Sequence, residues 1–357
     1  MMDVAGMGVG ANLSLFALGA AAVWWAGRAL VARTDLVAER TGMGRVFAGA
    51  VLLGVATSLP ELATTLSAAS AGAGALAGNN LLGGVAMQVA VLALIDGLAL
   101  RGRALTFFSP RASLIQYGVF LVLLLAVAAA AIVAPDLVIL GRVSVWSLAL
   151  AAIYGLSLWS LSRYEGAPRW EPRGEVAEPP QSARDMKDEV LERFAGIGLG
   201  RIGAELAGLA LVVVCGGWLV AVTGEAIAAM TGLGQTLVGA TLVALATSLP
   251  ELSTTWSAIR FGAYSMAVGN ILGTNGLEVA LLLPADVAYA QGSIFTQLDQ
   301  ASLLLAMIGI VVTLITLWGV LERQDRTLGR SLGVDSALVL LVYAGGMALF
   351  TVVTRGG

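Results

Sequence analysis

Ten long apolar stretches, divided by short polar segments, constrain the fold of this 357-residue chain more than any other feature. A hydrocarbon core roughly 30 Å thick is crossed by a helix of about 20 apolar residues, and every stretch is long enough. Hydrophobic residues make up 58% of the chain and charged residues 12%, which is far from the usage of soluble domains. We therefore predict an all-α polytopic membrane protein with ten transmembrane helices. The stretches are residues 13–33, 44–71, 75–99, 114–134, 143–162, 198–220, 234–259, 265–289, 301–321 and 334–354.

A polar segment, residues 163–197, separates two halves of five helices each. It carries mixed charges and four prolines, a composition typical of a solvated connection. We interpret it as a cytoplasmic linker loop and leave a regulatory role open. The first half then covers residues 1–162 and the second half residues 198–357.

The basic residues predict the orientation of the helices. If the N-terminus lies outside the cell, 18 of the 20 arginines and lysines fall in cytoplasmic loops, and only Arg142 and Arg355 do not. The first apolar stretch follows no basic segment and is too long for a signal peptide, so we expect it to be retained. We expect a multi-pass protein of the inner (plasma) membrane with both termini extracytoplasmic.

Composition also limits the partners. The net charge of −3 favours no nucleic-acid partner, and the chain lacks histidine, so proton transfer would rest on carboxylates. Cys215, which stands alone, predicts no internal disulfide and apolar packing in the sixth helix. A monomer is compatible with the sequence, which leaves the oligomeric state undetermined.

An internal duplication links the two halves. Residues 41–92 align without a gap onto 231–282 at a constant offset of 190, with 26 identities in 52 positions. Five helices separate equivalent positions, and an odd number reverses the direction across the membrane, so the two repeats must be inverted. Inverted repeats are the architecture of alternating-access transporters.

The strongest part of the repeat is Ala-Thr-Ser-Leu-Pro-Glu-Leu, at residues 56–62 and again at 246–252. Proline has no N–H, so Pro60 and Pro250 each leave one carbonyl of the preceding turn unpaired. In lipid such a carbonyl needs another partner. Both sites therefore expose backbone oxygens in mid-membrane.

Side-chain oxygens of the motif lie on the same helix face. Thr57 and Glu61 are four residues apart, as are Thr247 and Glu251. A glutamate in mid-membrane costs about 2.5 kcal/mol or more, and the chain carries this cost twice. Carbonyl, hydroxyl and carboxylate oxygens together suit hard cations such as Ca²⁺ or Na⁺ and not softer transition metals.

The second helix of each repeat adds further candidate ligands. Thr274 and Glu278 again lie four residues apart, and their counterparts in the first repeat are Gly84 and Gln88. The predicted site thus holds three carboxylates and one amide. Other acids lie near helix ends and are expected at the membrane interface: Asp96, Asp136, Glu225, Asp286 and Asp299.

Two repeats that read Ala-Thr-Ser-Leu-Pro-Glu, each followed by an asparagine-glycine segment, resemble those of the cation/calcium antiporter superfamily, in which the sodium/calcium exchangers are the nearest branch. The resemblance implies that Glu61 and Glu251 are the central ligands and that the first and sixth helices slide across a core of helices two, three, seven and eight. It further implies that the remaining ligands are Thr57, Thr247, Ser58, Ser248, Thr274, Glu278 in place of an aspartate and Gln88 in place of an asparagine. Gly84 stands where relatives have a serine hydroxyl, so we expect one weak sodium site.

Charge then predicts the mechanism. Three neighbouring carboxylates do not all stay ionised without cations, so one divalent ion, several monovalent ions or protons compete for the site. Competition for one site gives antiport, with no cofactor and no enzymatic reaction. We predict exchange of Na⁺ for Ca²⁺, and the alternative on the same scaffold is exchange of Ca²⁺, K⁺ or Na⁺ for H⁺. A cation channel, or an intramembrane enzyme that uses Glu61 and Glu251 as an acid pair, are the alternatives of other classes.

Overall fold

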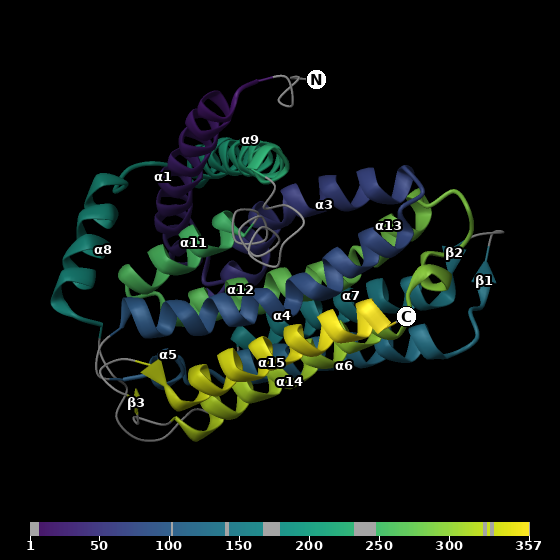
Figure 1. Ribbon diagram of the computed structural model, residues 1–357. Helices are drawn as coiled ribbons and strands as arrows, with labels where there is room; N and C mark the ends of the chain where they lie inside the picture. The colour runs from purple at the N-terminus through teal and green to yellow at the C-terminus, as the bar shows by residue number, and fades with distance from the viewer. Residues whose placement is uncertain are drawn as a thin grey trace.

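The fold is almost entirely helical, as shown by a computed structural model that describes residues 7–100, 103–139, 143–166, 179–231, 248–323, 327–328 and 332–356 (Figure 1). Its helices are α1 (Val9–Thr41), α2 (Arg45–Ala48), the π-helix η1 (Gly49–Leu53), α3 (Gly54–Ser70), α4 (Gly74–Ala99), α5 (Leu105–Phe108), α6 (Ala112–Val133), α7 (Val145–Gly166), α8 (Gln181–Arg193), α9 (Leu199–Thr231), α11 (Leu249–Arg260), α12 (Tyr264–Ala280), α13 (Leu282–Ala288), the 3₁₀-helix η3 (Ile294–Gln297), α14 (Gln300–Glu322) and α15 (Val334–Gly356).

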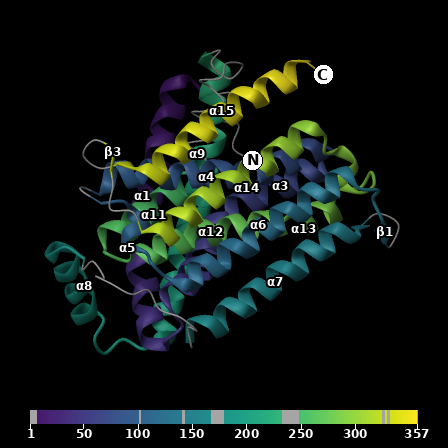
Figure 2. The same cartoon turned by 90° about the horizontal axis from the view of Figure 1, so that it is seen from below.

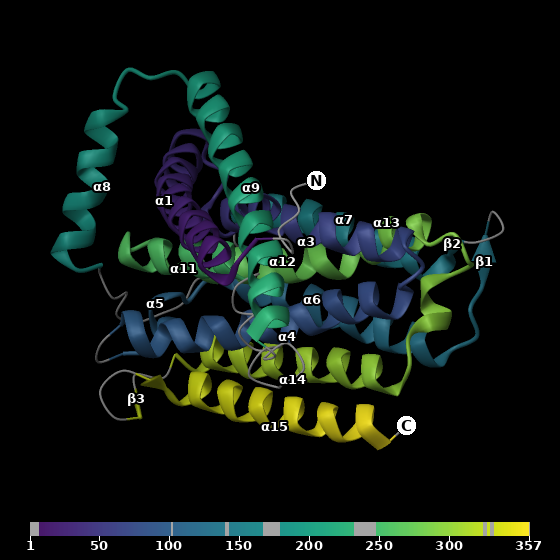
Figure 3. The same ribbon diagram turned by 45° about the horizontal axis from the view of Figure 1, so that its top comes forward.

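Two short antiparallel strand pairs connect helices at opposite ends of the bundle (Figures 1 and 3). Strand β1 (Val138–Ile139) pairs with β2 (Val143–Ser144), and β3 (Thr327–Leu328) pairs with β4 (Leu332–Gly333). Each pair precedes the last helix of its half, α7 or α15. Equivalent connections at opposite ends agree with the inverted repeat.

Nine helices in the described part of the chain are long and apolar enough to cross a membrane. They correspond to nine of the ten predicted stretches. The other stretch, 234–259, lies partly outside the described residues, and its end forms α11. The structure is therefore consistent with ten transmembrane helices in two inverted repeats.

The helices α1 and α9 are longer than the predicted stretches 13–33 and 198–220. Each has 33 residues, which corresponds to roughly 50 Å at about 1.5 Å per residue. They lie side by side and cross the other long helices at a steep angle (Figure 3). Gly19 permits this contact, since a Cβ atom there would lie 3.1 Å from the carbonyl oxygen of Gly216.

The linker, which we predicted as a plain connecting loop, contains a helix. α7 continues to Gly166, and the strong helix formers between residues 181 and 193 form α8. α8 lies apart from the main bundle (Figure 1) but is tied to α1, because Lys187 Nζ lies 2.5 Å from Glu39 Oε2. The linker is thus partly ordered and attached to one of the two long crossing helices.

Two buried aspartates join the halves of the chain. Asp96 at the end of α4 accepts hydrogen bonds from the amide of Gly333, which directly precedes α15. Asp286 in α13 accepts from the amide of Ser144, which directly precedes α7, and from the Ser147 hydroxyl. Each half therefore holds the last helix of the other half in place.

The helices α6, α7, α14 and α15 surround the part of the core formed by α4 and α12, whereas α1 and α9 pack on α3 and α11. Seen from below, α15 and α14 run beside α4 and α6, with α7 at the edge (Figure 2). The core itself is formed by η1, α3, α4, α11 and α12, which carry the repeated motifs.

Candidate functional site

Close backbone packing brings the two repeats together at their motifs. A Cβ atom at Gly273 in α12 would lie 2.2 Å from the Cα atom of Ala50, and one at Gly54 would lie 3.1 Å from the amide nitrogen of Thr274. Only glycine allows such an approach. The result places the hydroxyl oxygens of Thr57 and Thr274 3.4 Å apart.

A π-helical turn precedes the first motif. The segment η1 runs directly into α3, and such single turns are frequent at functional sites. Thr57 Oγ1 donates to the carbonyls of Leu53 and Gly54, and Ser58 Oγ donates to Gly54. Their hydrogens thus point back to the helix, so their lone pairs remain available to a cation. The repeat gave no signal for this turn.

The three predicted carboxylates are buried to different degrees. Glu251 is 0% exposed and Glu278 1% exposed, whereas Glu61 is half-buried. Among the described residues, both carboxylate oxygens of Glu251 and one of each of the other two lack a hydrogen-bond partner. Glu61 interacts electrostatically with both of the others. Buried carboxylates without donors require a cation or a proton.

The second pair of helices connects one carboxylate to the predicted amide. Gln88 Nε2 in α4 donates a hydrogen bond to Glu278 Oε1 in α12. The other oxygen of this carboxylate occupies the space beside Gly84, where a Cβ atom would lie 2.6 Å from Glu278 Oε2. The absence of a side chain at position 84 therefore makes room for the glutamate.

Carboxylates alone do not complete a cation site between the two repeats. In the described part of the chain, no three acidic side chains converge closely enough to hold one metal ion. Hydroxyl, carbonyl and amide oxygens must therefore complete any cation site here. Ser248 is buried at the start of α11, while Thr247 lies outside the described residues.

Asparagines that sequence reasoning did not select also face this region. Asn270 donates to Thr254 Oγ1 and Thr255 Oγ1 at 3.0 and 3.3 Å, and Asn275 donates to the carbonyl of Val85 at 3.3 Å. The side-chain oxygens of both asparagines have no hydrogen-bond partner in the described structure. The constant offset of 190 pairs Asn270 with Asn80 and could have indicated Asn270, whereas Asn275 corresponds to Val85 and had no such signal.

Outside the site, one expectation needs correction and others are refined. Asp96 and Asp286 lie near helix ends, as expected, and they are buried within the protein, because each accepts a hydrogen bond from one backbone amide of the opposite half. Asp299 is exposed and caps α14, as expected for an interfacial acid. Cys215 lies on the exposed surface of α9 and not in a packed interior, since α9 is a peripheral helix.

The long helix α9 covers both prolines of the repeated motif. A Cβ atom at Gly217 would lie 3.1 Å from Pro60 Cγ and 3.5 Å from Pro250 Cγ. α1 packs beside it on α11, where Gly27 faces the Ser253 hydroxyl. These two helices therefore form the wall of the site that faces away from α4.

Comparison with known proteins gives a consistent relationship. The family profile described as "Sodium/calcium exchanger protein" matches residues 11–162 and again residues 202–352. The inner membrane protein YrbG of Escherichia coli is 25% identical over 79% of this chain and 81% of its own. The sodium/calcium exchanger MaX1 of Methanosarcina acetivorans is 48% identical, but the match spans only 16% of each chain. The sodium-calcium exchanger NCX_Mj shares the fold with a TM-score of 0.68 and 18% identity, over 96% of this chain and 99% of the other.

Proposed function

Since this chain belongs to the sodium/calcium exchanger family of membrane cation antiporters, we propose that it exchanges Na⁺ for Ca²⁺ by alternating access at the site between the two repeats. The observation that carries this proposal is the set of buried carboxylate oxygens without hydrogen-bond donors at the crossing of α3, α11 and α12. Their ligand chemistry suits hard cations.

Each residue has a proposed role. Glu61 and Glu251 bind the divalent ion from opposite repeats, and Thr57 and Thr247 add hydroxyl and backbone oxygens beside them. Ser58, Ser248 and Thr274 supply oxygens to flanking sodium ions. Glu278, oriented by Gln88, contributes the third charge.

Competition drives the exchange. The carboxylates bear too much negative charge to be left without cations in a low-dielectric site, so a departing Ca²⁺ must be replaced. Movement of α1 and α9 over the two prolines would expose the site to one side of the membrane at a time. Both helices pack on the site through glycines, which permits sliding.

A second candidate, exchange of a cation for H⁺, is favoured by one observation. Gly84 offers no hydroxyl, and Glu278 fills its space, so one flanking sodium site has fewer ligands than its counterpart at Thr274. A proton on Glu278 would then replace one Na⁺.

The test is ion flux in vesicles reconstituted with the purified protein. We expect saturable ⁴⁵Ca²⁺ uptake driven by an outward Na⁺ gradient, with little uptake driven by K⁺. Uptake driven equally by a proton gradient without Na⁺ would support the second candidate. An ohmic current would identify a channel, and absence of any flux would refute transport.

A further inference from the structure

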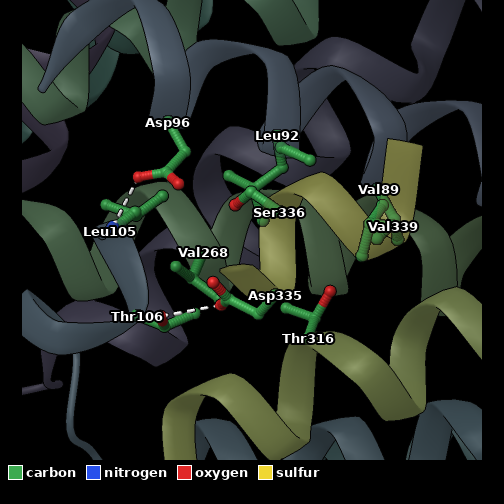
Figure 4. Close-up of a pocket in the computed structure, with 11 residues that line it drawn as sticks. Val89, Leu92, Asp96, Leu105, Thr106, Val268, Thr316, Asp335, Ser336 and Val339 are labelled. Carbon is green, nitrogen blue, oxygen red and sulfur yellow. Dashed lines mark hydrogen bonds between the residues drawn. The ribbon is translucent and has the colours of Figure 1, made fainter. Parts of the chain in front are cut away.

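A second acidic cluster lies at one end of the bundle, separate from the site between the repeats. Asp96 from α4 and Asp335 from α15 both line a small cavity, in which Asp96 is hydrogen-bonded to Leu105 and Asp335 to Thr106 (Figure 4). They are 1% and 4% exposed. The Thr106 hydroxyl and Ser336 lie beside them, and Val268 and Thr316 also line this cavity.

The two carboxylates differ in how they are satisfied. Asp96 accepts from the amides of Leu105 at 2.6 Å and Gly333 at 3.1 Å, one on each oxygen. Asp335 Oδ2 accepts from Thr106 Oγ1 at 2.8 Å. Asp335 Oδ1 is buried and has no hydrogen-bond partner in the described part of the chain. This oxygen therefore bears the uncompensated part of the charge.

The inverted repeat provides an internal comparison. Asp286, the counterpart of Asp96, accepts from the amides of Ile294 and Ser144 and from the Ser147 hydroxyl. Ser147 is the third residue of α7, as Ser336 is of α15, but the second residues are Trp146 and Asp335. Asp136 also approaches that end through the Ser144 hydroxyl, but it comes from the segment before the strands and not from the last helix of the half. A carboxylate in the first turn of the last helix is therefore particular to Asp335 in α15.

Two glycines leave the space that this second carboxylate occupies. A Cβ atom at Gly319 would lie 2.1 Å from Asp335 Oδ2. A Cβ atom at Gly333 would lie 2.5 Å from Asp335 Oδ1 and 3.0 Å from Asp96 Oδ2. Both carboxylates therefore pack against the same glycine, and the small cavity beside them is lined by both aspartates.

The start of α15 explains only part of this arrangement. A carboxylate in the first turn of a helix is stabilised by the helix dipole, which accounts for a charge at Asp335. The dipole does not provide a partner for Asp335 Oδ1, and it does not offset the repulsion between Asp335 and Asp96. A positive ion between the two carboxylates would do both.

We propose that Asp96, Asp335, Thr106 and Ser336 bind a hard metal cation, Na⁺ or Ca²⁺, that ties α15 to α4 and α5. All of the ligands are oxygens, which disfavours transition metals. The cavity has a volume of about 10 Å³, enough for one water-sized particle. Mg²⁺, which keeps several of its waters, does not fit. This ion has a structural role and is not transported.

The test is the number of ions that the full chain binds in lipid nanodiscs, measured by equilibrium dialysis with ²²Na⁺ and with ⁴⁵Ca²⁺ in separate arms. We expect Asp335→Asn to bind one ion fewer per chain than wild type in one arm and to retain antiport. The matched control is Asp299→Asn, an exposed aspartate that accepts hydrogen bonds from backbone amides at the start of α14. It should leave the count unchanged.

Two more variants keep the test decisive. Ser336→Ala removes one neutral ligand with little change of volume and should weaken the affinity of the same ion about tenfold, which covers the case that Asp335→Asn does not fold. Glu251→Gln removes the transport site but should retain the ion lost in Asp335→Asn, so failure of the proposed antiport is distinguished from failure of this site. If wild type, Asp335→Asn and Ser336→Ala bind the same number of ions with the same affinities, the proposal is overturned. The charge of Asp335 would then be neutralised by a proton or by an arginine side chain instead of a metal ion.

Discussion

The carboxylate of Glu278 lies directly against Gly84, with Oε2 at 2.6 Å from where a Cβ atom of residue 84 would be. The two residues belong to different repeats, and the contact relates two departures from the exchanger pattern. A glutamate is one methylene longer than the aspartate expected at position 278, and the glycine at position 84 accommodates the extra length.

Gly84→Ser alone should therefore impair exchange, because the new side chain would overlap the carboxylate of Glu278. Overpacking costs about 1–3 kcal/mol, so we expect the apparent Ca²⁺ affinity to fall roughly tenfold or more. Gly84→Ser combined with Glu278→Asp should restore Ca²⁺ affinity and steepen the Na⁺ dependence of ⁴⁵Ca²⁺ efflux. No recovery in the double variant would show that the two positions are not coupled.

Glu251→Gln should abolish exchange and leave the protein folded, because it removes a buried charge at nearly constant volume. In cation-free buffer the variant should be at least as stable as wild type, since wild type then holds an uncompensated carboxylate. Ca²⁺ at about 100 times its Kd should stabilise wild type by about 2.7 kcal/mol and the variant far less. Thermal unfolding with and without Ca²⁺ measures this, and transport at the wild-type rate would contradict the assignment. Glu61→Gln should give the same loss of exchange.

Gly217→Val should slow turnover without a comparable loss of Ca²⁺ binding. The new side chain would press on Pro60 and Pro250 and hinder movement of α9, at a cost of about 1–3 kcal/mol or roughly tenfold in rate. Gly208→Val is the matched control on the same helix, because a Cβ atom there meets no atom within 4 Å. Equal rates for both variants would argue against movement of α9 over the prolines.

Asn270→Ala should destabilise the protein by about 1–3 kcal/mol, because two buried hydroxyls lose their donor. Its counterpart Asn80→Ala should change stability by less than about 0.5 kcal/mol, since Asn80 is exposed and its bond to Thr65 measures 3.5 Å. Thermal unfolding in one detergent compares the pair. Similar losses of stability in the two variants would contradict this difference between the repeats.

Cysteine labelling should test the predicted orientation. After replacement of Cys215, single cysteines at Gln181 and at Gly356 should react with membrane-impermeant reagents from opposite sides. Reaction of both from the same side would refute the predicted orientation.

Much of the fold followed from the sequence because its determinants are local. The length of an apolar stretch requires a transmembrane helix, and the constant offset of 190 residues requires an inverted pair. The helical architecture and nine of the helices were predicted in this way, and the family was predicted from the resemblance of the repeated Ala-Thr-Ser-Leu-Pro-Glu motif. The full lengths of α1 and α9 were not predicted, because their additional turns contain charged residues, such as Asp35 in α1 and Glu225 in α9, which end the apolar stretches.

The details of the site depended on tertiary structure because they arise between segments far apart in sequence. The sequence identified Glu61, Glu251, Glu278 and Gln88 by type and spacing. That Gln88 donates to Glu278, that Gly84 makes room for it and that Asp96 meets Asp335 are contacts between the two halves, and no local pattern encodes a contact of that kind. Spacing along one helix determines which residues share its face, whereas the packing of two helices determines which atoms of those faces meet.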